Sequence, residues 1–285
     1  MRWQRGRSSG NVIDARGSSM PGGRVAVPGG LGLVGVLVFL AFQLLGGGGG
    51  AAFDVPGAFD DGTSAPDARG IPASQDPDRD LLDFTKYVFD STQSVWRRTV
   101  GSDYRAAKMV VYRGGVSTDG CGSASSAVGP FYCPGDQRVY IDLSFYRDMK
   151  DQLGASGDFA WAYVIAHEVG HHVQKLTGTS DEVHRLQQQD RDQANALSVR
   201  LELQADCYAG VWAKAVDAQL EPGDLEEAIN ASQAVGDDRL QRRARGSIDP
   251  DSFTHGTSAQ RAKWFRAGQA AGEPAACDTF STDSL

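Results

Sequence analysis

The segment His167-Glu168-Val169-Gly170-His171 limits what this chain can fold into more than any other stretch. Residues i and i+4 of an α-helix lie on one face, so the imidazoles of His167 and His171 can bind one metal ion if the segment is helical. Glu168 is rotated by about 100° from His167 on that helix, so its carboxylate lies beside the ion and can reach a water molecule without being a ligand. The alternative is a helix surface with two solvated histidines.

The helix that carries this segment is expected at residues 158–176. Its residues before the histidines are almost all apolar, which predicts a buried central helix, and Gly178 is suited to end it. Two neutral histidines in such an interior would lack partners, whereas a bound ion would satisfy both rings. Burial therefore favours a metal site, and H-E-x-x-H on a helix is the pattern typical of zinc peptidases.

A second helical segment is expected to complete the ligand set. Residues 181–219 contain no proline and no glycine before Gly210, and Glu202 and Asp206 are one turn apart within them. A catalytic zinc needs three protein ligands and an open position for water, and two histidines with one glutamate form a known set. We expect Glu202 to be the third ligand and Asp206 to accept the other ring N–H of a ligating histidine. The alternative is an acidic patch that faces solvent.

The remaining globular part is expected to add helices and a small β-sheet, which makes the fold class α+β and mainly helical. The apolar spacing predicts further helices at residues 77–98, 222–235 and 258–271, and strands at residues 108–112 and 138–143. The second strand precedes the metal helix, and we expect it to be an edge strand that holds an extended peptide by backbone hydrogen bonds. A purely structural strand is the alternative.

Three further histidines need an assignment. His255, in the loop before the last expected helix, is a candidate donor to an oxyanion, and the alternative is that it caps that helix. His172 and His184 are assigned structural or surface roles.

The first 75 residues differ from the rest in composition. Residues 1–24 are polar and arginine-rich, which indicates a disordered arm, and residues 25–45 carry no charge and predict a transmembrane helix. A cleaved signal peptide is the alternative. Residues 46–75 are rich in Gly, Ala, Pro and Asp and indicate a flexible linker. The positive-inside rule places the arm in the cytoplasm and the catalytic domain, residues 76–285, outside it.

The cysteines and the net charge agree with an extracytoplasmic domain that does not bind nucleic acid. Disulfides are permitted outside the cytoplasm. Cys121 and Cys133 flank one Gly/Ser-rich loop and are the natural pair, which would leave Cys207 to pair with Cys277, although the sequence permits three pairings. The net charge of −8 argues against a nucleic-acid partner, which would normally contact a basic face.

The chain resembles a family of bacterial neutral zinc metallopeptidases that are single-pass membrane proteins. The segments that carry the resemblance extend over almost the whole chain: residues 1–4, 7–9, 14–17, 121–122, 129–134, 139–142, 167–171, 202–207 and 254–256. More distantly, H-E-x-x-H with E-x-x-x-D is similar to the gluzincin peptidases, in which the glutamate is a zinc ligand and the aspartate orients a ligating histidine. The resemblance implies a zincin-like domain with Glu202 and Asp206 in these roles.

These observations together predict a membrane-anchored zinc endopeptidase. Zn²⁺ would be the cofactor, Glu168 the general base and a peptide or protein the substrate. One alternative is a non-catalytic or vestigial zinc protein that acts as a binding or scaffolding factor in the cell envelope, and another is a metal hydrolase that cleaves a non-peptide bond. The carboxylate of Glu168 argues against a structural zinc, which has no use for a non-ligating acid beside it.

Overall fold

The computed structural model describes residues 1–6, 9–18 and 70–285. The expected transmembrane helix at residues 25–45 lies outside this part of the chain, as does the expected linker apart from its last six residues. Within the described part, no helix has the length and apolar character that crossing a membrane requires.

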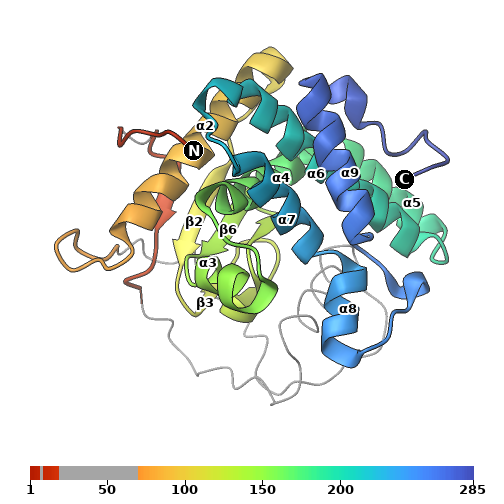
Figure 1. Cartoon of the computed structure of the whole chain (residues 1–285), viewed down its shortest axis with the longest axis horizontal. Helices are drawn as coiled ribbons and strands as arrows, with labels where there is room; N and C mark the ends of the chain where they lie inside the picture. Colours follow the sequence, from red (N-terminus) through yellow and green to blue (C-terminus); the bar gives the residue numbers. More distant parts are fainter. Residues whose placement is uncertain (7–8, 19–69) are drawn as a thin grey trace.

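The described residues form an α+β fold in which helices predominate, as the sequence predicts (Figure 1). The α-helices are α2 (Arg79–Val100), α3 (Phe145–Asp148), α4 (Asp158–Leu176), α5 (Thr179–Gln189), α6 (Ala194–Ala215), α7 (Asp224–Ala234), α8 (Asp237–Arg245) and α9 (Ser258–Ala271). The strands are β1 (Val12–Asp14), β2 (Lys108–Tyr112), β3 (Gly115–Ser117), β4 (Ser123–Ser125), β5 (Phe131–Cys133) and β6 (Arg138–Asp142).

The main sheet has four strands in the order β1-β2-β6-β5, and β3 and β4 form a separate two-stranded sheet. β2 is parallel to both β1 and β6, with Val110 opposite Tyr140, whereas β5 is antiparallel to β6. β2 and β6 are buried over nearly their whole length, and each has a central run of three or more apolar residues, 109–112 and 139–141. The edge strand on the β6 side is therefore β5, and the expectation that residues 138–143 form an edge strand is wrong.

α4 lies in the middle of the molecule, with α2 and the sheet toward one side and α6 and α9 toward the other (Figure 1). Phe159, Trp161 and Ile165 of α4 are fully buried, which confirms the expected central helix. α6 and α9 cross in close contact at Gly268, which has no side chain. A Cβ atom at this position would lie 1.9 Å from the carbonyl oxygen of Cys207. This crossing brings the side chains of α9 to the metal-binding face of α6.

The single helix expected at residues 181–219 is instead two helices, α5 and α6. The break needs neither glycine nor proline. Asp190 has an extended backbone, and its Oδ1 accepts hydrogen bonds from the backbone N–H groups of Asp192 (3.1 Å) and Gln193 (3.4 Å). Aspartate competes with helical hydrogen bonding in this way, and the turn lets α6 pack against α4 in a new direction.

The described N-terminal residues are part of the domain and do not form the expected disordered arm. β1 extends the main sheet, with Val12 opposite Met109. The Arg16 side chain is fully buried, and its guanidinium donates to both carboxylate oxygens of Asp14 (2.8 Å each) and of Asp76 (2.9 and 2.6 Å). The arginine-rich composition suggested disorder because these carboxylate partners and the free edge of β2 are not visible in local sequence.

This packing has a topological consequence. Because residues 9–18 pair with β2 and bind Asp76, they lie on the same side of any membrane as residues 70–285. A single crossing at residues 25–45 would separate the two parts. An arm in the cytoplasm and a catalytic domain outside it would require residues 9–18 to leave this packing.

Candidate metal centre

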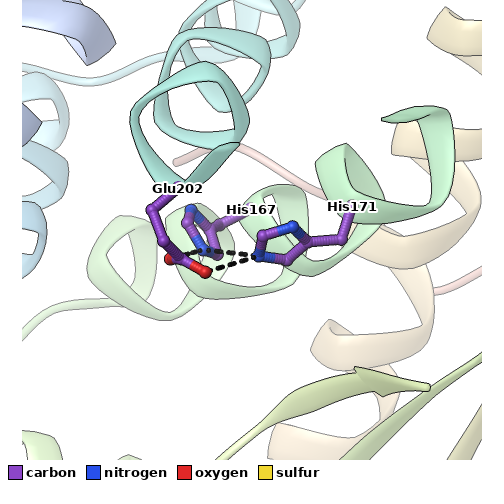
Figure 2. A group of neighbouring side chains, drawn as sticks. All are labelled: His167, His171 and Glu202. Carbon is purple, nitrogen blue, oxygen red and sulfur yellow. Dashed lines mark hydrogen bonds and ion pairs between the residues drawn. The ribbon is translucent and has the colours of Figure 1, made fainter. Parts of the chain in front are cut away.

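His167 and His171 of α4 and Glu202 of α6 converge on one point (Figure 2). The two Nε2 atoms are 3.2 Å apart, and the Glu202 carboxylate oxygens lie 3.2 Å from His167 Nε2 and 3.4 Å from His171 Nε2. Tetrahedral zinc with ligands at about 2.0–2.1 Å separates its donor atoms by about 3.3 Å. Two imidazole nitrogens and one carboxylate at these separations fit Zn²⁺, and the third ligand expected from the sequence is brought to the histidine pair.

A second acidic group, Asp158, Asp224 and Glu227, also has closely spaced oxygens. The α-ammonium group of Met1 lies within it and donates to Asp158 (2.8 and 2.9 Å) and Asp224 (3.3 Å). Glu227 accepts from the backbone N–H group of Phe159 (3.0 Å), so all three carboxylates have partners without a metal.

Glu168 lies beside the ligands without belonging to them. Its side chain is buried and lines the same cavity as His167 and His171. Burial raises the pKa of Glu168, because the carboxylate loses solvation there. A buried carboxylate that lies next to a metal site without being a donor to it suits the role of a general base.

The structure brings Asp206 to His167, the histidine of the pair that it contacts. His167 Nδ1 donates to Asp206 Oδ1 (3.0 Å), which leaves Nε2 with its lone pair directed at the metal position. Arg261 of α9 donates to the same carboxylate from Nε (2.9 Å) and Nη2 (3.0 Å), and the Tyr163 hydroxyl also donates to it. Burial alone would raise the pKa of Asp206, but the Arg261 guanidinium holds it below its usual value.

Sequence reasoning missed Arg261 and Gln174. Arg261 lies three and four residues before Trp264 and Phe265, on the buried face of α9. A charged residue at an inward-facing position of a helix was the signal in the sequence that it has a buried partner. Gln174 of α4 is fully buried, and its Oε1 accepts from Nδ1 of His171 (2.9 Å). Its position one turn after a ligand was the corresponding signal.

His255 lines the cavity, and a carboxylate holds it there. Two groups face His255 Nδ1, the Thr254 hydroxyl (3.0 Å) and the carboxylate of Asp237 at the start of α8 (3.3 Å). Asp237 also accepts from the backbone N–H groups of Thr254 (2.8 Å), His255 (2.6 Å) and Gly256 (3.1 Å). Burial lowers the pKa of His255, but Asp237 and Glu202 raise it above its ordinary value overall. The cap of α9 is Thr257, so the capping alternative for His255 is wrong.

The remaining histidines are placed as follows. His172 is buried and its Nε2 donates to the carbonyl oxygen of Arg105 (2.6 Å), so that Nδ1 accepts from the Tyr132 hydroxyl (3.1 Å). This structural role agrees with expectation, and it connects α4 to the edge strand β5. His184 of α5 lines the cavity.

The cavity in front of the metal position has a volume of about 180 Å³. The apolar part of its wall comes from five elements and the segment before β5: Pro130, Phe131, Phe145, Val164, Leu201 and Leu240. Because β5 is both a sheet edge and part of this wall, it replaces β6 as the candidate strand for pairing with an extended peptide.

The structure contains the two expected disulfides, Cys121–Cys133 and Cys207–Cys277. The first joins β5 to the Gly/Ser-rich loop before it. The second joins α6, which carries Glu202, to the C-terminal residues.

Comparisons with known proteins agree with the metal centre. The model of a family described as "Putative neutral zinc metallopeptidase" matches residues 1–280. "Uncharacterized protein YpfJ" of Escherichia coli (strain K12) is 49% identical over 98% of this chain and 99% of its own length. "Uncharacterized protein Rv2575" of Mycobacterium tuberculosis (strain ATCC 25618 / H37Rv) is 44% identical over 69% of each chain. No solved structure matches the chain at a significant level. The family match over nearly the whole length, with the relatives at these identities, shows that the chain belongs to this neutral zinc metallopeptidase family.

Proposed function

We propose that the protein is a zinc-dependent endopeptidase. The observation that carries the proposal is the position of Glu168, a buried carboxylate beside three closely spaced metal donors that is not itself a donor. A structural zinc site is closed by four protein ligands, whereas a three-ligand set next to a cavity leaves room for water and substrate.

The residues divide the reaction between them. Zinc held by His167, His171 and Glu202 would polarise the scissile carbonyl and lower the pKa of water to about 7. Glu168 accepts the proton of the attacking water and delivers it to the amine of the leaving product. His255, held at Nδ1 by Asp237, donates from Nε2 to the carbonyl oxygen as it becomes negative.

The substrate is proposed to be an extended peptide that pairs with β5. The backbone of an edge strand offers hydrogen bonds that do not depend on sequence, and the apolar wall of the cavity suits an apolar side chain beside the scissile bond. Digestion of a broad peptide library, with and without a zinc chelator and with Glu168→Gln as the control, tests this function. Chelator-sensitive cleavage by the wild type alone supports it. A zinc-loaded wild type that cleaves no peptide, or that hydrolyses only a non-peptide ester or amide, contradicts it.

We further propose that the domain acts outside the cytoplasm. Two disulfides support an oxidising compartment, and residues 25–45 remain the candidate membrane contact. Residues 9–18 then lie outside as well. A cysteine at the exposed Ser9 should react with a membrane-impermeant thiol reagent in intact cells, and reaction only after the cells are permeabilised would refute this location.

A further inference from the structure

A chain of side-chain amides leads from the second histidine ligand to a disulfide. His171 contacts Gln174, Gln174 contacts Gln204 of α6, and Gln204 contacts the backbone of Cys277. Cys277 is bonded to Cys207 of α6. Gln174, Cys207 and Cys277 are at most 1% exposed, so water does not compete for these contacts.

The amide of Gln174 can adopt only one orientation in this chain. Its Nε2 donates to the carbonyl oxygen of Leu201 (2.7 Å) and to Oε1 of Gln204 (3.1 Å), which uses both of its hydrogens. Its Oε1 must therefore face Nδ1 of His171, which lies 2.9 Å away. A flipped amide would place oxygen against the Leu201 carbonyl oxygen. His171 is consequently protonated at Nδ1, and its Nε2 carries the lone pair that a metal needs.

The amide of Gln204 is fixed in the same way by the next link. Its Nε2 donates to the carbonyl oxygen of Cys277 (3.1 Å), so its Oε1 faces Gln174. The carbonyl group at one end of the disulfide thus orients the Gln204 amide, which together with the Leu201 carbonyl group fixes the Gln174 amide. The other sulfur belongs to Cys207, which follows Asp206 directly in the sequence.

We propose that Gln174 and Gln204 are positioning residues for His171, and that the Cys207–Cys277 disulfide makes zinc affinity depend on an oxidising environment. The proposal rests on the metal site of the proposed function but not on its peptidase activity. Reduction would remove the covalent link between α6 and Cys277, and the residues around Cys277 would be held only by packing against α6 and α9 and by the hydrogen bonds between Arg200 and residues 279–282. The Cys277 carbonyl would then be a less fixed acceptor for Gln204. The chain would then bind zinc tightly only after its disulfide has formed.

The glutamine variants test the amide chain through zinc affinity, measured by competition with a chelating dye. Gln174→Leu should bind zinc about 10- to 100-fold more weakly, the usual effect of removing a partner of a ligating histidine. Gln204→Leu, one link further away, should lose less, about 10-fold or below. Gln174→Glu keeps an acceptor for His171 but cannot donate to Leu201, so it should bind zinc more tightly than Gln174→Leu.

A matched control separates positioning from damage to the fold. Gln93 of α2 is also buried and accepts from Tyr104 (2.6 Å) and the backbone of Ala107 (3.0 Å), and neither hydrogen bond involves a metal donor. Gln93→Leu should lower the unfolding midpoint of the metal-free protein but leave its zinc affinity unchanged. If Gln174→Leu binds zinc within twofold of wild type, or if Gln174→Glu is no better than Gln174→Leu, the positioning role is refuted.

The two disulfides form a second matched pair. Removal of one bridge by Cys207→Ser with Cys277→Ser should weaken zinc binding, whereas Cys121→Ser with Cys133→Ser should not. Wild-type zinc affinity in both double variants would overturn the redox dependence, and so would equal weakening in both. Should the first double variant fail to fold, reduced and oxidised wild type are compared at equal zinc concentration instead. A wild type that binds no zinc in either form would overturn the proposed function as well, so the two failures are distinguishable.

Discussion

Asp206→Asn tests whether the carboxylate beside His167 both neutralises a buried charge and orients a ligand. Asp206 is fully buried and surrounded by four donor groups, those of His167, Tyr163 and the Nε and Nη2 atoms of Arg261. Asparagine has the same shape but only one oxygen, so its amide nitrogen must face a donor. Arg261 would then be left as a buried charge without a full counter-charge.

The magnitude follows from that geometry. Breaking a buried ion pair by changing one partner costs about 3–5 kcal/mol in free energy of unfolding. Loss of the partner of a ligating histidine weakens metal binding by about 10- to 100-fold. Urea unfolding in the presence of a chelator measures the first effect, and competition with a chelating dye measures the second. Asp217→Asn, which changes an exposed partner of Lys214, is the matched control and should alter neither quantity.

A double variant separates the two effects. Asp206→Leu with Arg261→Met removes both charges, and the free energy of unfolding should recover substantially because no buried charge is left unpaired. Zinc affinity should stay low, because His167 still lacks its acceptor. If Asp206→Asn costs less than about 1 kcal/mol, the size of an ordinary hydrogen bond, and binds zinc like wild type, the assigned role of Asp206 is refuted.

Three further predictions concern residues outside the ligand set. Asp237→Asn should lower kcat about 10-fold or more at unchanged zinc content, because His255 loses the carboxylate that holds its ring, and steady-state kinetics with metal analysis would show it. Arg16→Met should lower the free energy of unfolding by about 3 kcal/mol in urea titrations, because Asp76 is left buried without its counter-charge; an unchanged midpoint would show that residues 9–18 are not docked. The Arg16 hydrogen bonds lower the pKa of Asp76. The stability that ionised Asp76 contributes is therefore complete above its ordinary pKa of 3.8 and is lost as pH falls through the lowered folded-state pKa. Arg16→Met should flatten this dependence of the free energy of unfolding on pH, and an unchanged dependence would contradict the assignment.

The metal helix and the third ligand could be predicted because the information is local. The apolar run before His167 and Gly178 after it define α4, whose bounds agree with the expectation at both ends. Glu202 was identified because ligand chemistry restricts the third donor to few residue types, and Asp206 lies one turn from it.

The residues that hold the ligands in place were harder to predict because their partners are distant in sequence. Arg261 reaches Asp206 only because α6 and α9 cross closely at Gly268. Asp237 contacts His255 from the first position of α8. The basic residues of this helix suggested a solvated segment, although Asp237 is buried. Neither contact leaves a periodic signal.

The N-terminal strand shows the same limit more sharply. β1 has three residues, and its stability depends on pairing with β2, almost a hundred residues later. Arg16 and Asp76, the ion pair that holds the strand, are separated by residues of low complexity. Composition alone therefore indicated a solvated arm.

The central claim is that Glu168 acts on water beside a zinc it does not bind, and Glu168→Gln tests it most directly. Zinc content of the purified variant and its rate of cleavage of a peptide that the wild type hydrolyses are measured on the same sample. The claim predicts close to one zinc per chain and a fall in kcat of at least about 100-fold, the contribution of a general base. Full activity in this variant, or loss of its zinc, would contradict it.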